Sequence, residues 1–502
     1  MLLDELVRQS GVGGEVRGDA SAEVSALAYD SRSVTPGTLF FCVRGEKSDG
    51  HEFAAEAVER GAAALVVERG LDVGVPEIQV PDARVAMAPL AAAFNGDPTA
   101  ELTVVGITGT NGKTTTAFLV RKLIEAAGRR CGLLGTVHRV VGGQVEEVER
   151  TTPEAIDLQA TFRLMLEADD DACSMEVSSH ALALHRAASI RFDVKVFTNL
   201  TQDHLDFHDD MEDYFAAKRL LFTAEGGAPE LSLEGGVSVV NVDDPYGRQL
   251  AEELAQGPEG DCVTFSAAGG EADLSARGVT YDVSGSRFVC ITPVGEIEVE
   301  APLPGHFNVE NSLAALGAAH ALGLDLRQAA RALAGADQVP GRFEPITEGQ
   351  NFTVLIDYAH TPDSLENVLE AARRITTGQL ITVFGCGGDR DREKRPLMGR
   401  AAAELSDLAI VTSDNPRSEN PRAIIDEIVA GIPEGAGGVL VQPDRRVAIA
   451  SAFAEASAGD TVVVAGKGHE QGQEFENGRK IPFDDRDVAR DELRHLAAGA
   501  AQ

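Results

Sequence analysis

A glycine-rich segment with a lysine and adjacent threonines has the composition of a phosphate-binding loop. It reads Gly106-Ile-Thr-Gly-Thr-Asn-Gly-Lys-Thr-Thr115. Gly109 and Gly112 would let the backbone curl tightly and point its N–H groups inward, as an anion requires. Lys113 could reach the β- and γ-phosphates of a nucleotide, and Thr114 could ligate Mg²⁺ through its hydroxyl. Ile107 stands where the strict pattern has glycine, so the loop is a variant, and a chance glycine-rich turn is the alternative explanation.

The surroundings of this loop favour a nucleotide site over a chance turn. A β-branched run, Leu102–Thr108, predicts a buried parallel strand before the loop, and a helical pattern begins at about Lys113. The N-terminus of that helix would add the positive end of its dipole to the site. We therefore expect ATP to bind here. The loop residues expected to contact it are Gly109, Thr110, Asn111, Gly112, Lys113, Thr114 and Thr115.

The elements that must position this loop belong to a chain too long for one ordinary core. With 502 residues, three domains are expected, and polar breaks near residues 95–98 and 335–341 divide the chain into segments 1–97, 98–336 and 337–502. Strand-like and helix-like runs alternate, which predicts an α/β fold with mostly parallel sheets. Short alternating strands over 262–303 predict an antiparallel insert.

Polar motifs follow several of these strand-like runs, where open α/β sheets place their ligands. The expected strands are Thr38–Val43, Ala63–Val67, Cys173–Val177, Val194–Leu200, Val237–Val242, Val354–Asp357, Ile381–Phe384, Leu408–Val411, Val439–Val441 and Val462–Val464. Residues 51–61 and 308–322 read as helices. Glu176 ends one strand and His204 follows another, although a helix cap and a structural histidine are the simpler explanations of each alone.

Charge and composition exclude several classes of function. The formal net charge of −36 argues against nonspecific nucleic-acid or anionic-membrane partners, because the mean field repels polyanions. Six scattered cysteines form no C-x-x-C pair, so zinc and redox motifs are absent from the sequence. No apolar run approaches ~18 residues and the first residues lack a signal-peptide pattern, so we expect a cytoplasmic protein without membrane insertion. Unusual local sequences surround Lys113, Lys218, Lys394 and Lys467.

Taken together, the variant loop and the order of the other motifs resemble the Mur ligase family over nearly the whole chain. The resemblance implies three domains: one for a UDP-sugar substrate, a central P-loop ATPase, and a C-terminal Rossmann-like domain for the incoming amino acid. It implies that a substrate carboxylate takes the γ-phosphate of ATP to form an acyl phosphate, which an amine then displaces. Such chemistry needs metal ions and cations around the transferring phosphoryl group. We expect the binding partners to be small-molecule substrates and the protein to be a monomer.

The same resemblance assigns the catalytic and nucleotide residues. It implies Mg²⁺ bound with help from Thr114, Glu176 and His204, and an N6-carboxylysine at Lys218, whose carbamate would also ligate metal. From sequence alone Lys218 would be a surface residue of an amphipathic helix. Lys113 completes the catalytic set. Further ATP contacts implied by resemblance are Asn308, Asn311, Arg342, Asp357 and His360.

The flanking segments of the chain resemble the family member that adds the third residue of the peptidoglycan peptide. The contacts implied for UDP-N-acetylmuramoyl-L-alanyl-D-glutamate are Ser31, Glu46, Lys47, Ser48, Thr151, Thr152, Ser178 and Arg186. Those implied for meso-diaminopimelate are Arg390, Asp414, Asn415, Pro416, Arg417, Gly466 and Glu470. Arg417 offers a bidentate fork for the extra carboxylate of diaminopimelate, which lysine lacks; a surface turn residue is the alternative.

Four other functions stay open at this point. Within the family, the chain could add L-lysine, or it could add a dipeptide, since that ligase has a similar N-terminal motif. A folylpolyglutamate synthase-like ligase shares the ATP core but lacks both the UDP-sugar segment and the Asp-Asn-Pro-Arg motif. An ATP-dependent switch without ligase activity is the rival from another class.

Overall fold

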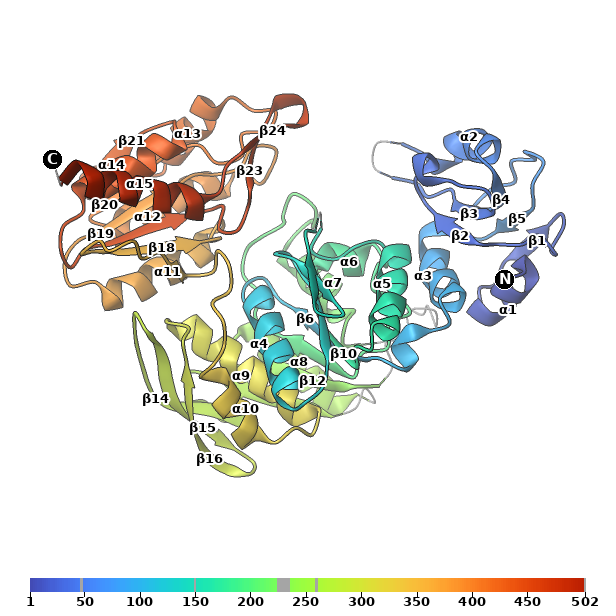
Figure 1. Cartoon of the computed structure of the whole chain (residues 1–502), viewed down its shortest axis with the longest axis horizontal. Coiled ribbons are helices and arrows are strands. Elements are labelled where there is room, and N and C mark those ends of the chain that lie inside the picture. The colour runs from blue at the N-terminus through green and yellow to red at the C-terminus, as the bar shows by residue number, and fades with distance from the viewer. Residues whose placement is uncertain (46–47, 149, 224–234, 258–260, 501–502) are drawn as a thin grey trace.

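The computed structural model describes residues 1–45, 48–148, 150–223, 235–257 and 261–500. Figure 1 shows three lobes, each built around its own sheet. The N-terminal and C-terminal lobes lie apart from each other, and the middle lobe joins them. The predicted three-domain α/β architecture is confirmed. The breaks at 97/98 and 336/337 stay a prediction.

The N-terminal lobe holds a five-stranded sheet in the order β1-β5-β4-β3-β2. Its strands are parallel except for β1, which pairs antiparallel with β5. The apolar strand Thr38–Phe41 (β3) is buried along its whole length, as its run of Leu and Phe predicts. The elements are α1 Leu3–Ser10, β1 Glu15–Arg17, β2 Ala26–Ala28, β3 Thr38–Phe41, α2 Ala54–Glu59, β4 Ala62–Val67, β5 Glu77–Gln79 and α3 Ala83–Phe94.

The middle lobe holds an eleven-stranded sheet in the order β16-β15-β14-β13-β12-β11-β6-β10-β7-β8-β9, with β6 in its interior between β11 and β10. Side chains of β6 alternate between two cores: Val105 and Ile107 pack with helices α4 and α9, whereas Val104 packs with α5 and α8. The elements are β6 Thr103–Thr108, α4 Lys113–Ala126, β7 Cys131–Leu134, β8 Arg139–Val141, β9 Gln144–Glu146, α5 Ala155–Glu167, β10 Ala172–Glu176, α6 Ser179–Ala183, β11 Val194–Phe197, α7 Met211–Arg219, β12 Val237–Asn241, α8 Pro245–Gln256, β13 Cys262–Ser266, β14 Leu274–Asp282, β15 Gly285–Thr292, β16 Gly295–Ala301, α9 His306–Ala321 and α10 Leu326–Leu333.

Both edges of this sheet differ from the sequence prediction. Strands β14 to β16 are antiparallel to one another, as expected, but β13 is parallel to β12, so residues 262–303 extend the central sheet and are no separate insert. At the other edge β7, β8 and β9 were not predicted. They are three or four residues long, too short to give a clear alternating pattern.

The C-terminal lobe holds a six-stranded sheet in the order β17-β18-β22-β19-β20-β21, in which only β17 is antiparallel. All five strands predicted here are confirmed. The elements are β17 Glu344–Pro345, β18 Thr353–Asp357, α11 Pro362–Ile375, β19 Leu380–Phe384, α12 Lys394–Leu405, β20 Leu408–Val411, α13 Pro421–Val429, β21 Gly438–Val441, α14 Arg445–Glu455, β22 Thr461–Ala465 and α15 Asp485–Ala500, with a separate hairpin of β23 Gly472–Phe475 and β24 Arg479–Pro482.

Candidate active site

The glycine-rich loop joins the carboxyl end of β6 to the start of α4. Gly109 and Gly112 adopt φ values of +148° and +83°, in the region that favours glycine. A Cβ at Gly109 would lie 1.9 Å from Thr198 Oγ1, so no other residue fits there. Because the residue before α4 is Gly112, no side chain caps this helix, and its first N–H groups are left for an anion.

Two lysines converge on this loop from different elements. Lys113 Nζ donates to the carbonyls of Gly109 and Thr110, at 2.8 Å each. Lys218 Nζ, on α7, donates to the same Gly109 carbonyl at 2.8 Å. Burial lowers the pKa of Lys113, and burial together with the charge of Lys113 lowers the pKa of Lys218 well below its usual range. Lys218, expected from sequence alone to lie on the surface, is 1% exposed.

Oxygen ligands suited to Mg²⁺ lie beside the loop. Thr114 Oγ1 donates to Glu176 Oε2 at 3.0 Å, and Glu176 also accepts from the N–H and the hydroxyl of Thr136, at 2.7 and 3.0 Å. Among the described residues no three His, Cys, Asp or Glu side chains form a metal cage. A hydroxyl and one carboxylate fit Mg²⁺, because this ion keeps several waters and takes its remaining ligands from phosphates.

His204 lies in a left-handed backbone conformation, with a φ of +56°. Its Nε2 is 3.4 Å from the carboxylate of the preceding Asp203. Burial lowers the pKa of His204 to about 3, so the imidazole is neutral at physiological pH, which is the form that binds metal. The His180 ring meets the His204 ring edge to face, with centroids 4.8 Å apart.

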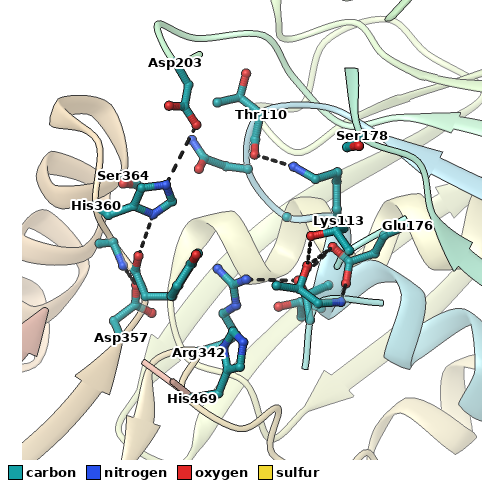
Figure 2. A pocket seen from close by; sticks show the side chains of 18 of the residues that line it. Thr110, Lys113, Glu176, Ser178, Asp203, Arg342, Asp357, His360, Ser364 and His469 are labelled. Carbon is teal, nitrogen blue, oxygen red and sulfur yellow. Dashed lines mark hydrogen bonds and ion pairs between the residues drawn. The ribbon is translucent and has the colours of Figure 1, made fainter. Parts of the chain in front are cut away.

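The C-terminal lobe completes the surroundings of the loop (Figure 2). Arg342 Nη2 donates to Thr114 Oγ1 at 3.0 Å. The Asn111 amide donates to Asp363 at 2.9 Å. His360 Nε2 lies 3.9 Å from Asp203. The two contacts of Arg342 and Asn111 tie the loop directly to residues more than 200 positions further along the chain.

Three of the remaining nucleotide-side candidates are held by hydrogen bonds within the protein. Asp357 accepts from the N–H groups of Phe343 and Ala359, at 2.6 and 2.7 Å, and burial raises its pKa to about 6. Asn311 Oδ1 accepts from Thr116 Oγ1 at 3.3 Å, and its amide donates to Asn308 at 3.0 Å.

The candidates for the muramoyl peptide fall into two places. Thr152 Oγ1 donates to the carbonyl of Glu176 at 2.9 Å and accepts from the N–H of Ser178 at 3.2 Å, and Arg186 donates to the carbonyl of Thr152 at 3.3 Å. Ser31 is in the N-terminal lobe, in a short turn where its hydroxyl donates to Glu56 at 3.4 Å. Glu46 and Lys47 lie outside the described residues, and Ser48 is exposed.

Three arginines surround Glu154, which lies two positions after the predicted substrate contact Thr152 but was not itself predicted as a site residue. Glu154 lies 3.2 Å from Arg84, 3.1 Å from Arg150 and 3.0 Å from Arg186. Arg84 belongs to α3, so this cluster joins the N-terminal lobe to the middle lobe. Three cations around one carboxylate leave a local positive excess in a strongly acidic chain, which suits an anionic substrate.

The candidates for the amino acid come from separate loops of the C-terminal lobe. Arg417, with a φ of +49°, donates from Nη1 to the carbonyl of Gly388 at 2.7 Å, and its Nε is 3.3 Å from Glu474. The Asn415 amide donates to Glu470 at 2.7 Å. A further group of candidates is placed around these by backbone contacts: Arg390, Asp414, Pro416 and Gly466.

One cavity of about 1650 Å³ connects most of these groups across the middle and C-terminal lobes. That volume exceeds the usual pocket of ~300–1,000 Å³ for one small ligand. The candidates that line it are Thr110, Asn111, Gly112, Lys113, Thr114, Thr115, Thr151, Thr152, Glu176, Ser178, Arg186, His204, Lys218, Asn311, Arg342, Asp357, His360, Arg390, Asn415, Arg417 and Glu470. Described candidates that do not line it are Ser31, Ser48, Gly109, Asn308, Asp414, Pro416 and Gly466.

Sequence reasoning missed several residues that line this cavity. Thr136 follows β7, a strand too short to be predicted, and Asp363 sits in the first turn of α11. Asp203 directly precedes His204, and that adjacency was the only signal for it. Glu310 lies between the predicted contacts Asn308 and Asn311, and that position was the only signal for it. Glu474 carries no motif signal, because its contacts with Arg417 and Asn415 join distant parts of the chain.

Three family models match the chain in order. The model described as "Mur ligase family, catalytic domain" matches residues 23–95, "Mur ligase middle domain" matches 107–319, and "Mur ligase, glutamate ligase domain" matches 341–468. The chain is similar to UDP-N-acetylmuramoyl-L-alanyl-D-glutamate–2,6-diaminopimelate ligases from several organisms. That of Gloeobacter violaceus is 48% identical over 98% of each chain, and that of Streptomyces coelicolor is 47% identical over 98% of this chain and 96% of the relative.

Solved structures agree with these matches. A structure of a UDP-N-acetylmuramoyl-L-alanyl-D-glutamate–2,6-diaminopimelate ligase aligns with a TM-score of 0.70 and 34% identity over 99% of each chain. A folylpolyglutamate synthase of Mycobacterium tuberculosis shares the fold, with a TM-score of 0.61 and 18% identity, over 82% of this chain and 94% of that one. In the part of the chain that the structure describes, no helix is long and apolar enough to cross a membrane.

Proposed function

The chain belongs to the Mur ligase family, and we propose that it joins meso-diaminopimelate to UDP-N-acetylmuramoyl-L-alanyl-D-glutamate at the expense of ATP, in peptidoglycan synthesis. The observation that carries this proposal is the single cavity that runs from the phosphate loop to the Asp-Asn-Pro-Arg loop. A switch ATPase would need no carboxylate-binding arginine at the far end of its nucleotide site. Arg417 at that end supports diaminopimelate over lysine.

The reaction that this cavity supports proceeds in two steps. An oxygen of the substrate's glutamyl carboxylate attacks the γ-phosphorus of ATP, the bond to the β-phosphate oxygen breaks, and ADP leaves. The amine of diaminopimelate then attacks the acyl phosphate, loses a proton, and inorganic phosphate departs from the tetrahedral intermediate. Lys113 and Arg342 lie where they would neutralise charge on the transferring phosphoryl group. Holding both substrates in one cavity supplies the alignment that each step requires.

Thr114, Glu176 and His204 are the residues that we expect to hold Mg²⁺. When bound, this ion would neutralise phosphate charge and orient the γ-phosphate for in-line attack. Lys218 supports a further assignment. Its lowered pKa favours the neutral amine, whose nitrogen can attack CO₂ and lose a proton to form a carbamate. The resulting anion would lie beside Lys113, whose Nζ contacts the same carbonyl, and would offset its positive charge.

The remaining assignments follow from these substrates. We place Thr152, Ser178 and Arg186 on the muramoyl peptide, Ser31 and the segment 46–48 on the uridine end, and the Arg417 loop on diaminopimelate. Glu154 would orient Arg186 toward the substrate carboxylate. We expect a cytoplasmic monomer, because ATP and UDP-linked precursors are cytoplasmic and the cavity is complete within one chain.

A coupled assay tests this function directly. Purified enzyme with ATP and Mg²⁺ is given UDP-N-acetylmuramoyl-L-alanyl-D-glutamate and either diaminopimelate, L-lysine or D-alanyl-D-alanine. We expect stoichiometric ADP, phosphate and a UDP-linked tripeptide with diaminopimelate, at a rate far above that with the other two amines. Phosphate release that does not depend on the UDP-linked substrate and the amine would instead identify a switch ATPase.

A further inference from the structure

Lys467 is a fully buried lysine beside the amino-acid end of the cavity, and it does not line the cavity. The glycines on both sides of it, Gly466 and Gly468, have φ values of +117° and +54°. These conformations turn the side chain into the protein. Its ammonium group donates three hydrogen bonds, to Asn415 Oδ1 at 3.0 Å, Glu470 Oε2 at 2.8 Å and the Gly472 carbonyl at 2.6 Å.

These three acceptors come from two segments of the chain. Asn415 follows β20, whereas Glu470 and Gly472 lie in the connection from β22 to β23, three and five positions after Lys467. Asn415 extends the network, because its Oδ1 also accepts from the N–H of Glu474 at 3.0 Å. One buried cation therefore fixes the Asp-Asn-Pro-Arg loop, the loop of Glu470 and the strand that carries Glu474.

Within this network only one of the two carboxylate oxygens of Glu470 is used as an acceptor. The Asn415 amide and Lys467 both donate to Oε2, and among the described residues Oε1 has no hydrogen-bond partner. Glu470 lines the cavity, as do Arg417 and Glu474. Glu470 Oε1 thus offers a negative acceptor, and the Arg417 guanidinium offers a positive fork, to an occupant with both an ammonium and a carboxylate.

We propose that Lys467 is a positioning residue for the incoming amino acid: it orients Glu470 and the Arg417 loop so that they receive the ammonium and the carboxylate of one amino-acid head. This proposal rests on the proposed function. Lys467 does not touch the substrate. It acts by holding Asn415, Glu470 and the start of β23, much as outer residues orient the ligands of a metal.

The substitution Lys467→Met removes the ammonium and keeps an unbranched chain of similar length. Three acceptors would lose this buried donor, and Glu470 would lose its cation and turn to other partners. We expect the KM for diaminopimelate to rise about 10- to 100-fold, as when the supporting residues of a ligand set are removed. The KM values for ATP and for the UDP-linked dipeptide should stay within about twofold. Arg446→Met removes an exposed cation of the same lobe and serves as the matched control.

A double-mutant cycle separates positioning from general structural support. If Lys467 acts through Glu470, then Glu470→Gln should cost much less in the Lys467→Met background than in the wild-type enzyme. Additive losses, or a fall in kcat with all three KM values unchanged, would overturn the proposal. Should Lys467→Met yield no folded protein, Lys467→Gln keeps a polar donor at this position and removes the charge. It should raise the KM for diaminopimelate alone by about 3- to 10-fold, and an unchanged KM would count against positioning.

Failure of this proposal and failure of the proposed function are distinguishable. Wild-type enzyme that makes no tripeptide refutes the function, whatever the variants do. Wild-type enzyme that makes the tripeptide, with a Lys467→Met variant whose KM for diaminopimelate is unchanged, refutes only the role of Lys467.

Discussion

Two Gly-Lys segments of the chain use the same pair of residues for different purposes. Lys113, after Gly112, is held by two carbonyls of its own loop and lines the cavity. Lys467, after Gly466, is held by three groups from two segments of the chain, one of them a carboxylate, and does not line the cavity. Neutral acceptors leave the charge of Lys113 available to a phosphate, whereas Glu470 balances that of Lys467. The partners of a lysine, and not its local sequence, decide whether it binds substrate or supports the site.

The elements that follow the two segments reinforce this difference. Lys113 begins α4, whose N-terminal N–H groups and dipole favour an anion. Lys467 is followed by the β23–β24 hairpin, which has no comparable dipole. A phosphate is therefore expected at the first segment only.

The largest expected effect comes from removing the cation that faces phosphate. Lys113→Ala should lower kcat by on the order of 1,000-fold, because charge on the transferring phosphoryl group would lose a preorganised partner. Single-turnover ADP formation measures this loss. Lys122→Ala, on the same helix but away from the cavity, is the matched control and should retain activity. Retained ADP formation in Lys113→Ala would refute the assignment of the loop.

A smaller but selective loss of activity is expected when the guanidinium group of Arg417 is removed. Arg417→Ala should lower kcat/KM for diaminopimelate about 100-fold, since one substrate carboxylate loses a charged partner, and should leave the KM for ATP within about twofold. Arg422→Ala, an exposed arginine five positions along, is the control. Because Lys467 only supports the fork, its loss should cost less than that of Arg417. The reverse order, or equal effects on ATP and diaminopimelate, would contradict the distinction between contact and support.

How much of this could be predicted from sequence differs between the two lysines. The phosphate loop is local: its glycines, lysine and flanking strand are adjacent in the chain, so residues 102–115 contain the whole signal. Two partners of Lys467, Glu470 and Gly472, lie three and five positions further along the chain, but Asn415 lies 52 positions away in the loop after β20. Only the sheet order β22-β19-β20 brings that loop to Lys467, and no spacing in the sequence contains it.

The same distinction holds for the fold and for the rest of the site. Long apolar strands such as those of residues 354–357 and 462–464 were predicted correctly, because burial on both faces leaves a continuous apolar run. The burial of Lys218 could not be read from an amphipathic helix. Its Nζ is drawn inward by a carbonyl of the phosphate loop, more than 100 residues earlier.

The smallest expected effect concerns pH at the nucleotide end of the cavity. Burial, together with Asp243, Asp363 and Asp244, raises the pKa of Glu310 to about 7. This carboxyl is neutral below that pH and ionised above it, and it lines the cavity that a polyanionic nucleotide would enter. The KM for ATP should therefore rise as pH increases from 6 to 8. One added negative charge, partly screened by solvent and salt, weakens ATP binding by about 0.5–1 kcal/mol. This corresponds to a KM for ATP that is about two- to fivefold higher.

The substitution Glu310→Gln isolates this contribution. The ionisation of ATP itself affects both proteins equally, so the difference between their pH profiles reports Glu310 alone. We expect the variant to keep a low KM for ATP at pH 8, and we expect the KM for diaminopimelate to show no dependence on this substitution at any pH, because that substrate binds at the other end of the cavity. Parallel profiles for ATP in the two proteins would show that Glu310 does not face the nucleotide. A matching change for diaminopimelate would show that the two ends of the cavity are not electrostatically separate.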